Sequence, residues 1–449
     1  MHFTKVIQGS YYSSVSSKKV AFYENSLVCL NDEGRIGQIV QQDDPTYHNV
    51  LDQAKADNIL WTLADDQYLL PGFIDTHVHA PQWPNISQAL NSFEEDWFFN
   101  YTFPLEAKFS DAAFAHKVYD NLVHTLIDNG TTTVLYFGSL DNAGNVELVK
   151  SCQKFHQRGL IGKVVMDNPD ECPDYYHDES TESALADTEA FIHTVDKMNA
   201  GQFIKMQAVI TPRYLTSCTL EGMRGLGELA KKYNLLIQSH CSENNTEDAY
   251  ALDNYNKRDS EMLDETGLLT DKAIMAHGTL LNNFDLDLFQ ERGTSIAHCP
   301  VSNGFHGTAV LPVKKALEKD INVGLGTDIC GGYEPSIYQT LRQAAMASAM
   351  LSDGVDNSIA ADKRGVGDAR ITADTAFYLA TAGGAKTLHL NTGVVQEGAF
   401  ADLQIVHSKY PEFIEQTPYT RFEKLMYETT TNEIDVVLTQ GLVAKGEIK

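Results

Sequence analysis

The sequence predicts an α/β protein with a (β/α)8 TIM-like barrel and a small β-sandwich domain built from both ends of the chain. Eight short apolar runs alternate with helical stretches in the middle of the chain, which is typical of a closed parallel sheet. Strand-like segments with turn glycines flank this region on both sides. The length of 449 residues and the 43% apolar content suit one large domain with an appendage. We expect residues 1–68 and 392–449 to form the small domain and residues 69–391 the barrel.

The two ends of the chain are both predicted to be rich in strands. SLVCL (26–30) and RIGQIV (35–40) flank Asn31-Asp32-Glu33-Gly34, a pattern that favours a hairpin loop. Near the other end, the strand-like pieces are GVVQEG (393–398), ADLQIV (401–406) and IDVVLTQGLVAKG (434–446). These pieces can pair with the N-terminal strands into one small β domain.

Eight apolar runs are candidates for the barrel strands. They lie at 69–79, 131–137, 162–167, 203–211, 235–240, 273–278, 294–298 and 322–328. One connecting helix is predicted from Ser110 as its N-cap to Gly130 as a left-handed C-terminal residue. Its apolar face is expected to carry Phe114, Val118, Leu122 and Leu126.

Charge and composition exclude several classes of partner. A formal net charge of −27 repels phosphate backbones and anionic lipid heads, so nucleic acid and membranes are not expected partners. The first residues lack the apolar core of a signal peptide, and no run of about 18 apolar residues occurs. Seven cysteines without a CxxC pair fit a reducing compartment. We therefore expect a cytoplasmic protein.

The ends of the predicted strands carry residues that bind metals. His77 and His79 are two apart on one strand, so their side chains face the same way at the end where barrel enzymes place their chemistry. Two imidazoles on one strand suit zinc, iron or another borderline divalent ion, although an isolated HxH pair also occurs without a metal. Further candidates end other strands: His240, His277 and Asp328. We predict one Zn²⁺, with Fe²⁺ as the alternative, bound by His77, His79, His240 and Asp328.

A proton carrier is expected beside this metal. Glu243 follows His240 by three residues, in the loop that leaves the strand, where its carboxyl group can reach both water and substrate. A binuclear site would need a bridging lysine at the end of the fourth strand, and Lys205 lies near its beginning, which favours one metal. His298, His306 and the cysteines near strand ends are expected to serve packing or loop support. The cytidine-deaminase signature is excluded, because no P-C-x-x-C follows His177-Asp178-Glu179.

Seven segments, in the same order over nearly the whole chain, resemble the guanine deaminases of the amidohydrolase superfamily. They are PGFIDTHVHAPQ, NYTFPLEAKF, ITPRYLTSC, SHCSEN, MAHGTLL, RGTSIAHCPVSN and VGLGTDICGGYEPSI. HxH and GTD alone indicate only the superfamily, whereas HAPQ, YTFP, TPRY and GTDxxGGY are more specific. Two loops depart from the pattern, GFHGTAVLP (304–312) and Glu334-Pro335, and these leave the fine substrate preference open.

The resemblance implies hydrolytic deamination of guanine to xanthine and ammonia, in a homodimer with a small-molecule purine as its substrate. It implies the same four metal ligands, proton transfer by Glu243 with Asp328 as a second acceptor, and a polarising hydrogen bond from His277. Substrate contacts fall on Gln82 and Arg213, whose amide and guanidinium suit a lactam edge. Aromatic residues expected to stack on the purine are Trp83, Trp97 and Tyr214.

Three alternatives remain at this point. One keeps the chemistry and changes the substrate to 8-oxoguanine, a pterin, a thio- or homocysteine-linked adenosine, a triazine or another amino-heterocycle. A second is an amide-ring hydrolase of the same superfamily, which usually needs two metals. The third is a non-catalytic scaffold, and the complete set of expected ligands together with Glu243 argues against it.

Overall fold

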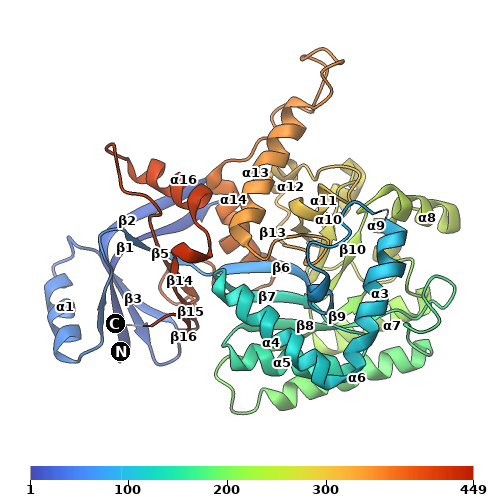
Figure 1. Cartoon of the computed structure of the whole chain (residues 1–449), viewed down its shortest axis with the longest axis horizontal. Helices are drawn as coiled ribbons and strands as arrows, with labels where there is room; N and C mark the ends of the chain where they lie inside the picture. Colours follow the sequence, from blue (N-terminus) through green and yellow to red (C-terminus); the bar gives the residue numbers. More distant parts are fainter. Residues whose placement is uncertain (1, 93, 448–449) are drawn as a thin grey trace.

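The chain folds into a barrel and a smaller sheet domain beside it, as Figure 1 shows for the computed structural model, which describes residues 2–92 and 94–447. Eight parallel strands follow one another in sequence order around the barrel. They are β6 (Phe73–His79), β7 (Thr131–Phe137), β8 (Arg158–Val165), β9 (Gln207–Pro212), β10 (Ile237–Cys241), β11 (Ala273–His277), β12 (Ser295–His298) and β13 (Val323–Leu325). Each lies within or overlaps the predicted run. The predicted fold class of a barrel with a small β domain is confirmed.

The barrel closes between its first and last strands. His79 N donates to Ile329 O at 2.7 Å, and Asp328 N donates to His77 O at 2.9 Å. The two segments approach so closely that a Cβ at Gly326 would lie 2.7 Å from the Cβ of His77. Glycine is therefore required at this position for the segment after β13 to reach β6.

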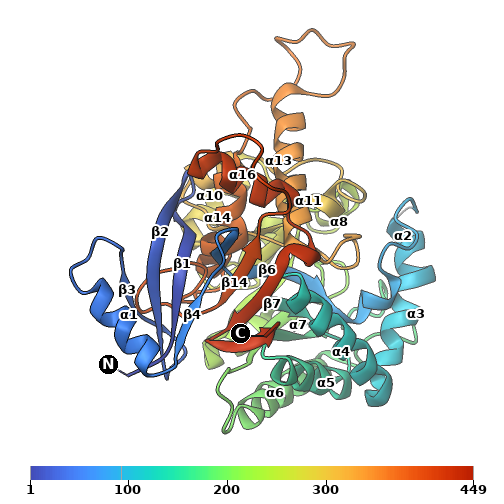
Figure 2. The ribbon, with the colours of Figure 1, turned by 60° about the vertical axis from the view of Figure 1, so that its left-hand side comes forward.

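Helices surround the barrel and connect its strands. The principal ones are α4 (Ala112–Asp128), α5 (Asn142–Lys154), α6 (Thr181–Met198), α7 (Leu220–Tyr233), α8 (Asn245–Tyr255), α9 (Asp259–Glu265), α10 (Asn283–Arg292), α11 (Pro300–Asn303), α12 (Val313–Glu318), α13 (Ile337–Asp353), α14 (Ala373–Tyr378) and α15 (Gly384–Thr387). Between β6 and α4 the chain makes a long excursion of short turns. These are η1 (Ala80–Asn85), α2 (Glu94–Trp97), η2 (Phe98–Thr102), α3 (Phe103–Glu106) and η3 (Ala107–Ser110). The C-terminal part of α13 and the loop after it project from the barrel (Figures 1 and 2).

The small domain is one mixed sheet to which both ends of the chain contribute. Its strands are β1 (Phe3–Ser16), β2 (Lys19–Asn31), β3 (Ile36–Val40), β4 (Leu60–Thr62), β5 (Gln67–Pro71), β14 (Leu403–His407), β15 (Ile434–Thr439) and β16 (Leu442–Lys445). The predicted hairpin joins β2 to β3, with Gly34 at a φ of 71°. β14 lies between β5 and β15, so it joins the two ends of the chain in one sheet. Helix α1 (Tyr47–Ala56) packs on one face.

A buried ion pair joins the barrel to the small domain. Arg158, at the start of β8, binds the carboxylate of Asp402, and both side chains are at most 6% exposed. The same carboxylate accepts hydrogen bonds from Thr392 Oγ1 and Gln440 N, each at 2.7 Å. These contacts lie at the N-terminal end of the barrel strands, away from the ends that carry the predicted metal ligands.

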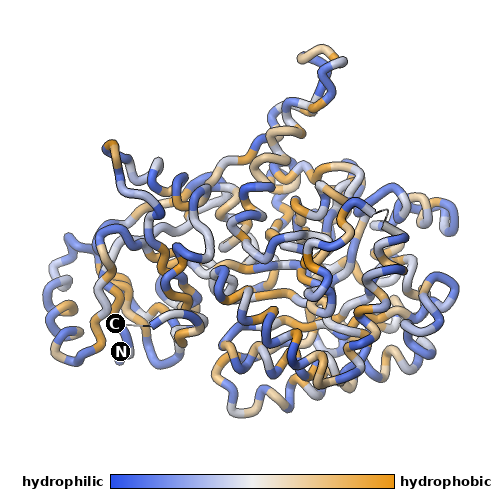
Figure 3. The backbone as a smooth tube through the Cα atoms, viewed as in Figure 1, coloured by the Kyte–Doolittle hydropathy of each residue, from blue (hydrophilic) through white to orange (hydrophobic). Residues whose placement is uncertain are grey.

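Hydrophobic stretches concentrate in the strands of both domains, whereas the outer helices alternate in polarity (Figure 3). All eight barrel strands are buried along almost their whole length, as expected for strands covered on both faces. Among the residues that the structure describes, no helix is both long and apolar enough to cross a membrane.

Three local predictions were wrong. The N-cap of α4 is Asp111, whose carboxylate accepts from Ala113 N at 2.8 Å, whereas Ser110 Oγ donates to Ala107 O. Phe114 and Val118 are only partly buried, because the helix face turned to the core is displaced by one residue. The segment 393–398 forms turns rather than a strand, and helix α16 (Pro418–Glu428) was not expected.

Candidate active site

Four histidines and one aspartate meet at the C-terminal end of the barrel. His77 and His79 end β6, His240 lies near the end of β10 and His277 ends β11. Asp328 follows β13 by three residues. All five side chains are nearly inaccessible to solvent. The predicted convergence of these strand ends is therefore present.

The donor atoms lie close enough to share one ion. His79 Nε2 is 3.1 Å from His240 Nε2, and Asp328 Oδ1 is 3.3 Å from His77 Nε2 and 3.5 Å from His79 Nε2. Among the described residues, three groups have ligand atoms within 4.8 Å of one another. They are His77, His240 and His277; His77, Cys299 and Asp328; and Glu243, His277 and Asp328.

The environment of His77 Nε2 also indicates that the cluster binds an ion. This nitrogen is buried and unsatisfied apart from a 3.3 Å contact with Asp328 Oδ1, among the residues that the structure describes. A buried polar atom without a partner costs about 1–3 kcal/mol. A divalent ion would use that lone pair, so the residues present fit a metal.

Burial and neighbouring charges favour the neutral form of His79, His240 and His277. Burial, and then the neighbouring charges, hold the pKa of His79 and of His240 well below the usual range. Burial lowers the pKa of His277 to about 4. For Asp328, burial alone would raise the pKa, but the facing imidazoles, His77 first, more than reverse this and leave it below its usual value. Neutral imidazoles and a carboxylate are the protonation states that metal binding needs.

Backbone and amide oxygens orient two of the imidazoles. Arg213 O lies 2.6 Å from His240 Nδ1 and can only accept, so the Nδ1 of His240 carries the proton and its Nε2 lone pair faces the cluster. Asn303 Oδ1 lies 2.9 Å from His277 Nδ1, which likewise leaves Nε2 as an acceptor. The amide nitrogen of Asn303 has no partner among the described residues, and turning this amide would give His277 the opposite tautomer. The donor role predicted for His277 requires that second orientation or a second proton on the ring.

Glu243 lies in a loop that is pinned on several sides. Its Oε2 is 3.5 Å from His277 Nε2 and accepts from Tyr214 Oη at 3.3 Å. Its backbone N donates to Glu247 Oε2 at 2.8 Å, and Thr279 donates to its carbonyl oxygen. The predicted proton carrier is thus held beside the histidine cluster.

Three residues at strand ends around the cluster have positive φ angles although none is glycine. Ser242 has a φ of 50°, His277 of 71° and Asp328 of 51°. Such conformations are costly for residues with a Cβ and persist only where the surroundings fix them. Here Asp259 Oδ2 accepts from Ser242 N at 2.8 Å. Three such residues therefore lie where the functional side chains are aimed, although others occur in loops elsewhere in the chain.

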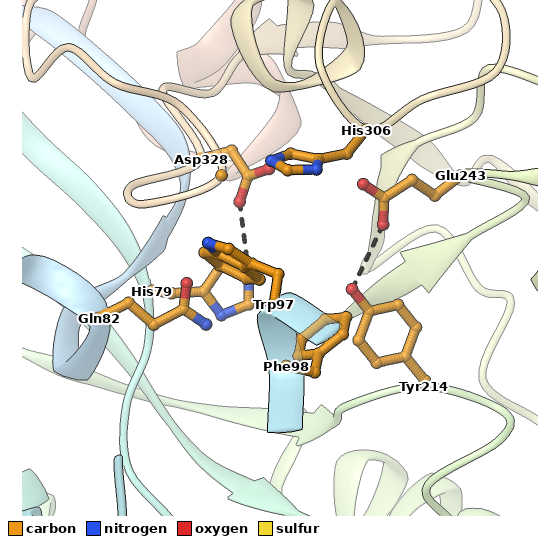
Figure 4. A pocket seen from close by; sticks show the side chains of 9 residues that line it. His79, Gln82, Trp97, Phe98, Tyr214, Glu243, His306 and Asp328 are labelled. Carbon is orange, nitrogen blue, oxygen red and sulfur yellow. Dashed lines mark hydrogen bonds and ion pairs between the residues drawn. The ribbon is translucent and has the colours of Figure 1, made fainter. Parts of the chain in front are cut away.

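A pocket opens beside the cluster (Figure 4). Its lining combines members of the cluster with aromatic and polar side chains. The lining residues are His79, Gln82, Trp97, Phe98, Tyr214, Glu243, His306, Asp328 and Gly331. The Tyr214 ring stacks on His240, with ring centroids 3.9 Å apart and planes 9° apart. Flat apolar surfaces and the reactive groups therefore face the same space.

One buried carboxylate behind the lining was missed by sequence reasoning. Glu106, at the end of α3, is 1% exposed and holds Arg213 through two hydrogen bonds, of 2.7 and 3.0 Å. It also accepts from Gln82 Nε2 at 2.8 Å and from Tyr176 Oη at 2.9 Å. A charged residue within the otherwise apolar turn Phe-Pro-Leu-Glu-Ala is the signal that could have found it.

The remaining candidates lie at different distances from the pocket. Arg213 is buried behind the lining, and Trp83 does not line the pocket, since its indole donates to Asn121 Oδ1 at 2.7 Å. His298 is buried at the end of β12 and is not part of the lining either. His306, expected to support a loop, lines the pocket near Asp328 and packs against Trp97. Lys205 precedes β9 and is exposed at the opposite end of the barrel.

An eight-stranded parallel barrel with histidines on its first, fifth and sixth strands and an aspartate after its eighth defines a metal-dependent hydrolase of the barrel type. The family model described as "Amidohydrolase family" matches residues 68–443. This chain belongs to the amidohydrolase family.

Relatives with known names lie within this family. The chain is 34% identical to the guanine deaminase of Dictyostelium discoideum, over 93% of this chain and 91% of the relative. It is 34% identical to that of Mus musculus, over 84% and 83% of the two chains. Among solved structures, the guanine deaminase from C. acetobutylicum with bound guanine in its active site has a TM-score of 0.87 and 30% identity, covering 98% of this chain and 99% of that one.

Proposed function

We propose that this protein is a guanine aminohydrolase, which converts guanine and water to xanthine and ammonia. The observation that carries the proposal is the position of Glu243 between Tyr214 and His277, at the edge of the histidine cluster and facing the same pocket as Gln82. The guanine deaminases at 34% identity, and the relative that holds guanine in its active site, support this substrate.

The cluster fits a single divalent ion, and we propose Zn²⁺, with Fe²⁺ as the alternative, held by His77, His79, His240 and Asp328. Three imidazoles and a carboxylate form the mixed nitrogen and oxygen set that these ions accept. Such an ion, when bound, supplies Lewis acidity and makes water nucleophilic at neutral pH.

Glu243 is proposed to move the protons of the reaction. It takes a proton from the water that attacks C2 of guanine and delivers it to a ring nitrogen. The second water proton passes, by way of a carboxylate of the site, to the exocyclic amine, so that the C–N bond breaks and ammonia leaves. Tyr214 donates a hydrogen bond to the Glu243 carboxylate and holds it at one side of the pocket. His277 and Asp328 lie on the other side of the Glu243 carboxylate. There His277 can reach the developing oxyanion, and Asp328 can reach the remaining water proton.

Substrate binding is proposed to rest on Gln82 and Arg213, with aromatic faces beside them. Gln82 lines the pocket and presents an amide to the lactam edge. Arg213 lies behind the lining with its Nε buried and without a hydrogen-bond partner among the described residues, so a direct contact with the substrate would require the guanidinium or the lining to move. Tyr214 and Trp97 contribute lining surfaces that suit a flat heterocycle, whereas the stacking role predicted for Trp83 would require it to turn toward the pocket.

The wider assignments follow from the same family. We propose a cytoplasmic homodimer. We also propose barrel limits at residues 69 and 391, although the chain passes from the small sheet to the barrel at Gly72, between β5 and β6. The remaining alternative is a related aminohydrolase acting on 8-oxoguanine, a pterin or a triazine. The unusual loop 304–312, which brings His306 to the pocket, is where such a preference would arise.

Ammonia release from guanine, 8-oxoguanine and adenine by zinc-loaded protein tests the proposal. We expect turnover of guanine at least about tenfold above either analogue, because loss of a matched polar partner in a buried site costs at least that factor. Glu243→Gln is the control for contaminating activity. Turnover of 8-oxoguanine alone would assign the alternative, and no turnover with a filled metal site would reject the guanine assignment.

A further inference from the structure

The Glu106 carboxylate is saturated by donors from three parts of the pocket wall. Oε1 accepts from Gln82 Nε2 at 2.8 Å and from Arg213 Nη2 at 3.0 Å. Oε2 accepts from Arg213 Nη1 at 2.7 Å and from Tyr176 Oη at 2.9 Å. A carboxylate offers about four lone-pair positions. All four are occupied, in a place where none of the four side chains is more than 2% exposed.

Two of the partners of Glu106, Arg213 and Tyr176, are held in their proton-donating states by their surroundings. Burial alone would lower the pKa of Arg213, but Glu106 more than offsets this and the pKa rises above its usual range. Burial first, and then the Glu106 carboxylate, raise the pKa of Tyr176 well above its usual value, so its phenol keeps the proton and donates. Phe98 and Phe103 lie over the Arg213 guanidinium, with centroids 5.4 and 5.1 Å away, and keep water from it.

An ionised carboxylate can only accept, and this decides which way the Gln82 amide points. Its nitrogen must face Glu106, which turns Oε1 toward Cys330 N, a donor 3.3 Å away. The reverse orientation would place oxygen against oxygen on one side and two donors together on the other. A glutamine amide is otherwise nearly symmetric in shape and can turn to suit either kind of ligand edge.

The polarity of this amide distinguishes two kinds of aminopurine. A lactam edge offers a carbonyl acceptor beside an N–H donor, whereas a 6-amino edge offers a donor beside a bare ring nitrogen. An amide that is free to turn pairs with both, but a locked amide pairs with only one. Resting on the proposed function, we propose that Glu106 is a positioning residue that determines specificity, by locking Gln82 in the orientation that accepts lactam purines and rejects their 6-amino counterparts.

The test compares guanine with 2,6-diaminopurine, which carries the same 2-amino group at the reacting carbon and the opposite edge at position 6. In Glu106→Gln the acceptor becomes a group that can also donate, so the stronger of the two contacts that fix Gln82 no longer selects one orientation, and only the 3.3 Å contact with Cys330 N opposes turning. We expect the ratio of kcat/KM for guanine over 2,6-diaminopurine to fall at least about tenfold, since discrimination through a buried polar partner is lost. Tyr176→Phe removes a donor to the same carboxylate without changing its polarity, and the ratio should stay within about twofold of the wild-type value.

A second variant covers the case in which Glu106→Gln does not fold. Gln82→Leu removes the amide and leaves Glu106 in place, and the preference for guanine should fall to a similar extent. Equal losses on both substrates in Glu106→Gln, with an unchanged ratio, would mean that Glu106 serves the fold alone and would overturn the proposal. A full lactam preference in Gln82→Leu would overturn it too.

Failure of the proposed function would be distinguishable from failure of this inference. If the wild-type protein does not turn over guanine, the same ratio is measured as equilibrium affinities of guanine and 2,6-diaminopurine by calorimetry. A lactam preference in binding that Glu106→Gln abolishes supports the lock even then. An equal affinity of the wild-type protein for both purines rejects it.

Discussion

Two walls of the pocket are built in different ways. The metal-facing wall consists of side chains at or just beyond the ends of β6, β10, β11 and β13. The other wall has Gln82 from η1 in its lining, and behind Gln82 lie Glu106 from α3, Tyr176 from a loop and Arg213 from just after β9. Strand ends have fixed directions in a closed barrel, whereas turns and loops are directed by their contacts with one another. We propose that the first wall serves chemistry and the second recognition.

Removing the proposed metal should reduce turnover more than any other change, and it alters only the first wall. Dialysis against a chelator should reduce turnover below detection, because no other group in this wall supplies a Lewis acid. Zinc or iron should restore activity, and metal analysis should find one ion per chain. Full activity of protein shown to be free of metal would contradict the assignment of this wall.

Glu243→Gln should come next in size. General acid and base catalysis contributes about 10²–10⁴-fold, so we expect kcat to fall about 10³-fold. Because glutamine has almost the same shape, metal content and the affinity for xanthine should change little, which separates proton transfer from binding. A variant that keeps more than about a tenth of wild-type kcat would assign the proton transfer to another residue.

Arg213→Lys tests the second wall and should act mainly on binding. Lysine cannot form the two-pronged contact with Glu106, so we expect KM for guanine to rise about tenfold while metal content stays unchanged. Arg158→Lys is the matched control, since it loosens a similarly buried arginine pair at the far end of the barrel. That control should lower the melting temperature and leave KM as it is. A loss of metal in Arg213→Lys would show that the two walls are not separable.

Tyr214→Phe should give the smallest effect, because it removes one hydroxyl group and keeps the ring. The ring that stacks on His240 remains, whereas the 3.3 Å hydrogen bond to Glu243 is lost. A net hydrogen bond is worth about 0.5–1.5 kcal/mol, which corresponds to roughly a two- to twelvefold fall in kcat. Steady-state kinetics at fixed metal content measures it. A fall as large as that of Glu243→Gln would mean that the phenol itself transfers a proton.

The difference between the walls also explains what the sequence could predict. His77 and His79 stand two apart on an apolar run, and that spacing alone fixes their common direction. His240, His277 and Asp328 end similar runs, so their convergence follows from the closed barrel. Glu106 shows only a charge within an apolar turn, which does not give its partner, because its place beside Arg213 depends on the path of the chain from residue 80 to residue 110.

The remaining wrong or missing predictions concern helix ends and loops, where the sequence offers several similar polar residues or no periodic pattern. Ser110 and Asp111 are both good N-cap residues. Asp111 is the N-cap because the preceding turn η3 includes Ser110. Helix α16 begins with Thr417 as its N-cap and Pro418 in its first turn, a start signal that the short strand-like pieces around it outweighed. His306 follows a short helix in an unusual loop, and periodicity carries no information about where such a loop folds.

The place of β14 in the small sheet has a consequence for biosynthesis. Strand β5 pairs with β14, and Gln404 Nε2 donates to Pro71 O across 333 positions of sequence. The ribosome therefore synthesises the whole barrel before this edge of β5 can pair with β14. Until then that edge is an unpaired strand of the kind that invites association with other chains. We expect the nascent protein to depend on chaperones until β14 emerges from the exit tunnel.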